Sequence, residues 1–71
     1  MNNAYMSART VDELRAMELD LYNETHDKGR FIEGSEEYYI VQMELLESAF
    51  AALFPDDYDY HRRGRQQLGK E

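Results

Sequence analysis

The sequence predicts an all-α fold, an antiparallel hairpin of two helices near residues 11–27 and 36–54. Apolar residues recur in both stretches at intervals of three and four, which is the period of an amphipathic helix. Residues that commonly begin and end helices flank both stretches. The connection that ends at Ser35 is short, so the two helices must be antiparallel neighbours.

The first helix has a clear start signal in Thr10 and Glu13. A threonine followed three residues later by a glutamate is a capping box, in which each side chain binds a free backbone amide at the helix start. Gly29, with Lys28 and Arg30 beside it, is typical of a helix end. One face, spanning about 140° at 100° per residue, carries the apolar residues and one threonine: Val11, Leu14, Met17, Leu21, Tyr22 and Thr25.

The second helix is apolar over a wider arc, about 220°. Ser35 is a suitable N-cap, Glu36 and Glu37 suit the first turn, and Pro55 ends the helix. One apolar row has heptad spacing and comprises Tyr39, Met43, Leu46, Phe50 and Leu53. A second row lies beside it and comprises Tyr38, Val41, Leu45, Ala49 and Ala52.

The two apolar arcs differ in width, so the first helix covers only part of the second. We expect the core of the hairpin to contain Leu14, Met17, Leu21, Tyr39, Met43, Leu46, Phe50 and Leu53. The uncovered residues are predicted to contact another molecule: Tyr38, Val41, Gln42, Leu45, Ala49 and Ala52. We expect a second copy of the chain to cover them, which gives a homodimeric four-helix bundle; the alternative is a different protein that takes the helix into a groove. Gln42 interrupts the apolar arc and is a candidate for fixing register or oligomeric state.

The chain is long enough for one domain. We expect an N-terminal extension at 1–9, the hairpin at 10–55 and a flexible polar tail with a basic end at 56–71. Residues 1–61 hold fourteen Asp or Glu against four Lys or Arg, whereas residues 62–71 hold one against four. An acidic body repels nucleic acid and anionic lipid and favours basic protein surfaces.

The sequence lacks the residues that characterise several functional classes. There is no cysteine, His26 and His61 lie far apart, and the acidic run at 56–59 lacks the glycine of a calcium-binding loop. No nucleophile–base pattern or phosphate-binding glycine loop is present. We therefore expect no metal, no cofactor and no enzymatic activity. Without an export segment or an apolar run of membrane-spanning length, we expect a cytoplasmic protein that does not enter the membrane.

These observations predict a small acidic protein-interaction module that acts as a regulator, adaptor or inhibitor. A first alternative is an inhibitor of phage or mobile-element type, whose carboxylates imitate the phosphates of nucleic acid. Glu37, Glu44 and Glu47 would form part of that acidic surface. A second alternative is nucleic-acid binding through the tail, where residues 58–65 combine tyrosines with arginines.

Overall fold

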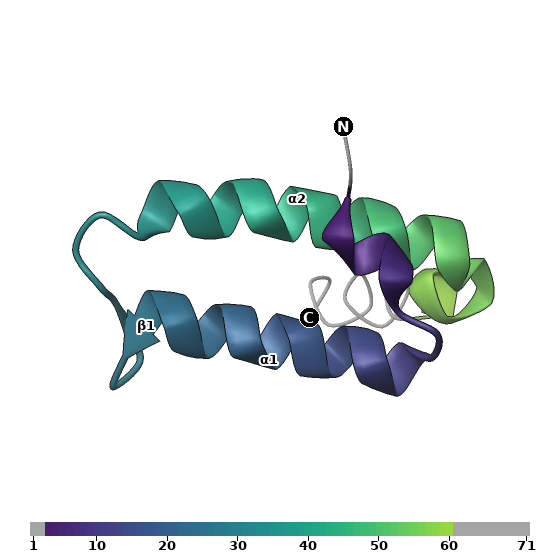
Figure 1. Cartoon of the computed structure of the whole chain (residues 1–71), viewed down its shortest axis with the longest axis horizontal. Helices are drawn as coiled ribbons and strands as arrows, with labels where there is room; N and C mark the ends of the chain where they lie inside the picture. Colours follow the sequence, from purple (N-terminus) through teal and green to yellow (C-terminus); the bar gives the residue numbers. More distant parts are fainter. Residues whose placement is uncertain (1–2, 61–71) are drawn as a thin grey trace, which may run out of the picture.

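The structure is a computed structural model that describes residues 3–60. Two helices, α1 and α2, run antiparallel and side by side, as Figure 1 shows. A 3₁₀ helix, η1, lies over one half of this pair, and a short strand pair, β1 and β2, joins the helices at the other end. The two predicted helices are confirmed; the strand pair was not predicted. The elements are η1 (Ala4–Ser7), α1 (Val11–Thr25), β1 (His26–Asp27), β2 (Arg30–Phe31) and α2 (Glu36–Leu53).

Helix α1 begins as the sequence predicts. The backbone N–H of Glu13 donates to Thr10 Oγ1 at 3.1 Å, and Glu13 Oε2 accepts from the backbone N–H of Arg9 at 2.6 Å. The helix ends at Thr25, two residues earlier than expected. The Thr25 side chain is buried, and its hydroxyl donates to the Leu21 carbonyl at 2.8 Å, so no polar group is left unpaired there.

The strand pair explains the early end of α1. His26 pairs with Phe31 and Asp27 with Arg30 in an antiparallel register. The two turn residues both have positive φ, 53° at Lys28 and 80° at Gly29, as a two-residue hairpin turn requires. The expectation that Gly29 directly follows the helix was therefore wrong, because His26 and Asp27 are extended. The His26 ring stacks on Tyr22, with centroids 4.0 Å apart, and contacts Phe31 at 4.2 Å.

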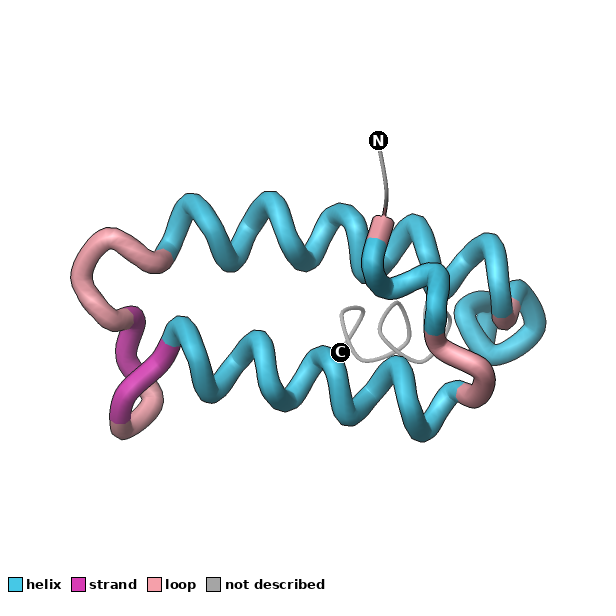
Figure 2. Tube along the Cα trace, viewed as in Figure 1, coloured by secondary structure: helices cyan, strands magenta, loops and turns pink. Residues whose placement is uncertain are grey.

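Helix α2 ends one residue before the predicted boundary, and Ser35 occupies the N-cap position without a side-chain capping bond. Residues 55–60 are helical again, as Figure 2 shows beyond the end of α2. Pro55 suits the first position of a helix, where no N–H is needed. Tyr58 then packs edge-on against Phe50, with ring centroids 5.6 Å apart. The predicted flexible tail therefore begins with an ordered helical turn. The rest of that prediction, 61–71, lies outside the described residues.

The core lies between α1, the C-terminal half of α2, and η1. Leu14 from α1 is buried against Leu46, Ala49 and Phe50 from α2. Tyr5 from η1 and Ala8, which follows it, complete this buried cluster. The N-terminal extension predicted at 1–9 thus contributes to the core through its described residues.

Candidate functional site

The predicted partner-binding row of α2 falls into two parts. Ala49 is 0% exposed, and Leu45 packs against the core, so the chain itself covers these two positions. Val41 and Tyr38, one and two turns from Leu45 toward the N-terminus of α2, are 49% and 51% exposed. Gln42 is half-buried between the two parts, and Ala52 is exposed near the end of the helix. The open part of the row is therefore its N-terminal half.

The covering element is η1. Asn3 caps it, because Asn3 Oδ1 accepts from the backbone N–H of Tyr5 at 3.0 Å. Two hydrogen bonds then attach it to α2. Asn3 Nδ2 donates to the Leu45 carbonyl at 2.7 Å, and the Tyr5 hydroxyl donates to Gln42 Oε1 at 3.0 Å. Gln42, the polar residue in the apolar arc of α2, therefore has a hydrogen-bond partner within its own chain.

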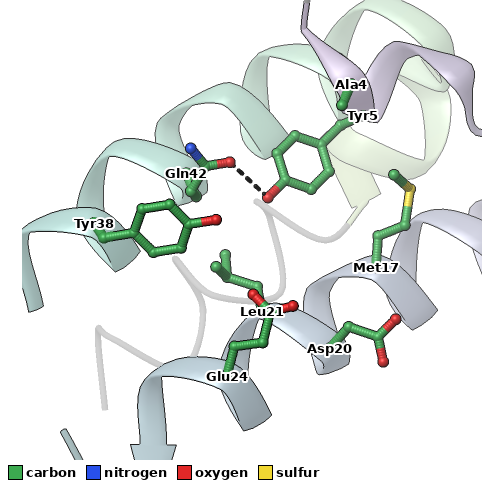
Figure 3. Close-up of a pocket in the computed structure, with 8 residues that line it drawn as sticks. All are labelled: Ala4, Tyr5, Met17, Asp20, Leu21, Glu24, Tyr38 and Gln42. Carbon is green, nitrogen blue, oxygen red and sulfur yellow. Dashed lines mark hydrogen bonds between the residues drawn. The ribbon is translucent and has the colours of Figure 1, made fainter. Parts of the chain in front are cut away.

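A groove of about 290 Å³ lies between α1 and α2, beside the first residues of η1 (Figure 3). The rings of Tyr5 and Tyr38 point toward each other on one side of it, and Asp20 and Glu24 extend from α1 on the other. Met17 and Leu21 supply its apolar lining from α1. The complete lining is Ala4, Tyr5, Met17, Asp20, Leu21, Glu24, Tyr38 and Gln42.

The groove is electronegative. Asp20 and Glu24 are one helical turn apart on α1, and among the described residues the lining includes no Lys or Arg. Burial raises the pKa of Tyr5 above its ordinary value of 10.0, and the neighbouring Tyr38 and Glu24 raise it further. Negative charge near a phenol disfavours its ionisation, so the carboxylate of Glu24 acts on the pKa of Tyr5 in the same direction as the larger effect of burial. The site therefore disfavours added negative charge and favours cations.

A second groove, of about 340 Å³, opens on the opposite side of α1. Its lining residues are Arg15, Glu18, Leu19, Tyr22 and Tyr39. Leu19 is 59% exposed, which makes it one of the most exposed apolar residues between 3 and 60. The charges here are one arginine and one glutamate, so this groove has no net charge. The two grooves thus share an apolar character and differ in electrostatics.

The other predicted residues are distributed as follows. Glu37 and Glu44 are exposed, whereas Glu47 is half-buried beside Arg15 and Phe50 in a small cleft. Of the expected core, Leu14, Leu21, Leu46 and Phe50 are buried; Met17, Leu53, Tyr39 and Met43 are half-buried. The arginines of the basic tail at 61–71 lie outside the described residues.

Three residues that hold η1 against the helix pair, Asn3, Tyr5 and Ala8, were not predicted from the sequence. A signal for them exists, because asparagine is a good N-cap and Tyr5 and Ala8 are three residues apart, on one side of a helical turn. The segment is too short to produce an amphipathic pattern. Its hydrogen bonds to Leu45 and Gln42 join residues that are 42 and 37 positions apart in the sequence.

Comparison with protein-family models, curated proteins and solved structures finds no match to this chain. Between residues 3 and 60, no three His, Cys, Asp or Glu side chains are grouped as a metal site would need. Within the same range, no helix combines the length and apolar composition that a membrane crossing requires.

Proposed function

We propose that this chain is a protein-binding module that engages its target through the open half of α2 and the acidic groove beside it. One observation carries the proposal. Tyr38 and Val41 are half exposed on the same apolar row in which Leu45 and Ala49 are covered by the chain itself. Covering such side chains is favourable by about 25 cal/mol per Å² of apolar area, so this surface gains free energy when a partner binds.

A protein with such a surface acts by binding another protein, as a regulator, an adaptor or an inhibitor. A foreign protein is the partner we favour. A four-helix bundle of two copies would use the whole row from Tyr38 to Ala52, and η1 already occupies the middle of that row. A homodimer that uses only the open half is the alternative partner.

Site-specific photo-cross-linking tests the proposal. A benzophenone amino acid at Val41, introduced in the cell that makes the protein, should form a cross-link to one partner. Ile40 supplies the matched control, because it is 51% exposed on the same helix and points about 100° away from Val41. The captured protein is then purified, and Val41→Asp should weaken its binding by at least about tenfold, whereas Ile40→Asp should leave it within about twofold.

Equal cross-linking from Val41 and Ile40, or none from either, would count against the proposal. A cross-linked product with twice the mass of the chain, together with a dimer in light scattering, would identify the partner as a second copy.

A nucleic-acid-mimicking inhibitor is the second candidate, supported by the exposed carboxylates. Glu37 and Glu44 are exposed on α2, and Asp12, Asp20 and Glu24 are exposed on α1. Residues 3–60 hold fourteen acidic and four basic residues, a net charge of −10. In this case Glu37→Lys with Glu44→Lys should abolish target binding while Val41→Asp has little effect, and binding should fall steeply with salt.

A further inference from the structure

The acidic groove is continuous with the place that η1 occupies. Ala4 and Tyr5 of η1 form the end of the groove, and beyond them the space between α1 and α2 is open. In one half of the molecule a segment of the chain therefore acts as a third layer on the helix pair (Figure 1). In the other half, no segment between residues 3 and 60 forms such a third layer over the groove.

We infer that the groove binds a cationic amphipathic helix of a partner protein, an inference that rests on the proposed function and specifies its partner. A third helix is the natural occupant of the space between two antiparallel helices, because helices pack at interaxial distances of about 8–10 Å with their side chains interlocked. Met17, Leu21 and Tyr38 offer apolar contacts to its buried face. Helices bind such grooves through apolar residues three and four positions apart.

The length of the groove sets the length of the contact. From Met17 to Glu24 helix α1 rises by about 10 Å, at 1.5 Å per residue. An occupant parallel to α1 therefore makes contact over about two helical turns. Tyr5, held by Gln42, limits the groove at one end, so the occupant extends from there past Tyr38 toward the strand pair.

Charge selects the occupant. Asp20 and Glu24 are exposed and four residues apart, so their carboxylates match lysines or arginines spaced four apart on a second helix. The net charge of −10 over residues 3–60 speeds the approach of a cation over long distances. The opposite groove offers no such preference, because Arg15 offsets Glu18 there. A cationic helix should therefore discriminate between two grooves of similar volume.

Two synthetic peptides test this inference with the full chain. Both are 16-residue alanine-based helices with leucines at positions 4, 8, 11 and 15; one carries lysines beside the leucines and the other glutamates. We expect the lysine peptide to shift the amide NMR signals of Asp20, Glu24, Tyr38 and Gln42 in a saturable manner that weakens with salt. The glutamate peptide should not shift them.

Charge-matched variants complete the test. Asp20→Lys with Glu24→Lys should lower the affinity for the lysine peptide by at least about tenfold. Glu33→Lys with Asp57→Lys has the same net charge and alters two exposed carboxylates that do not line the groove, so it should stay within about threefold of the parent. Circular dichroism confirms that both variants are folded.

Three results would overturn the inference. The first is equal binding of both peptides, and the second is binding of the lysine peptide at Leu19 and Tyr22. The third is tighter binding by a peptide of residues 61–71, which would make the chain's own basic segment the occupant. If no peptide binds while Val41 still cross-links a partner, the cationic helix is excluded and the proposed function stands; if both experiments fail, both proposals fall.

Discussion

The two halves of α2 continue the same two apolar rows but have different surroundings. In the C-terminal half, Leu46, Ala49 and Phe50 are buried under α1 and η1. In the N-terminal half, Tyr38 and Val41 belong to the same apolar row as Ala49 and yet remain half exposed. The pattern of apolar residues gives the width of the surface that must be covered. It does not say which segment covers it, or over what length.

The difference between the halves comes from a few residues at the N-terminus of the described chain. Two hydrogen bonds and the buried ring of Tyr5 hold η1 against α2. Because η1 is only one turn long, it covers the helix pair over a short distance and leaves the acidic groove open. The following predictions test this contrast, from the largest expected change to the smallest.

The covered half should be sensitive to truncation of its core. Leu46 is 3% exposed, and Leu46→Ala should lower the free energy of unfolding by about 3 to 5 kcal/mol, because it loses buried area and leaves a cavity. A domain of this size has only about 4 to 10 kcal/mol in total. Leu19→Ala removes the same atoms from an exposed site and should cost less than about 1 kcal/mol. Urea unfolding followed by circular dichroism measures both, and equal losses would contradict the contrast.

Removal of the Tyr5 ring, which covers the C-terminal half of α2, should cause the second-largest loss of stability. Tyr5→Ala should lower the free energy of unfolding by about 2 to 3 kcal/mol, since the ring is nearly fully buried. Amide hydrogen exchange should become faster around Leu45 and Ala49, and change least around Tyr38. A uniform change along α2 would show that η1 does not stabilise one half selectively.

The hydroxyl of Tyr5 should contribute less to the free energy of unfolding than its ring does. Tyr5→Phe removes the hydrogen bond to Gln42 and should cost about 1 kcal/mol. In a double-mutant cycle with Gln42→Leu, the coupling between the two positions should be of the same size. A coupling near zero would mean that this hydrogen bond does not hold η1 in place.

The same phenol should give the protein an alkaline pH dependence. The pKa of Tyr5 is raised above its ordinary value of 10.0 in the folded chain, so the folded state holds the proton more tightly than the unfolded state. The corresponding stability is fully present below pH 10.0 and is lost as pH rises through the folded pKa. Tyr5→Phe should lose stability less steeply above that pH than the parent, and identical profiles would contradict the shift.

The open half should tolerate change almost without loss of stability. Val41→Ser alters a side chain that is half exposed and should change the free energy of unfolding by less than about 0.5 kcal/mol. Ala49→Ser places a hydroxyl at a fully buried position of the same row and should cost more, since a buried hydroxyl needs a partner. Comparable effects at the two positions would indicate that Val41 is covered in solution.

Much of the fold could be predicted from local signals. The capping residues Thr10 and Glu13 located the start of α1, and the heptad row from Tyr39 to Leu53 located α2. The strand pair could not be recognised, because two-residue strands have no periodicity and their turn places Lys28 at a positive φ that lysine rarely adopts. For the candidate site, the sequence predicted Tyr38, Val41 and Gln42 as partner-binding residues, and it assigned Met17 and Leu21, which also line the groove, to the core.

By itself the sequence determined the helical periodicity, the antiparallel hairpin and the excess of apolar surface on α2, because these follow from residue spacing and short connections. The tertiary structure alone decided where that excess remains open. The contacts of Asn3 with Leu45 and of Tyr5 with Gln42 join residues distant in sequence, and their formation depends on the three-dimensional packing of the helix pair. The same packing sets Asp20 and Glu24 beside Tyr38 and so gives the open groove its negative charge.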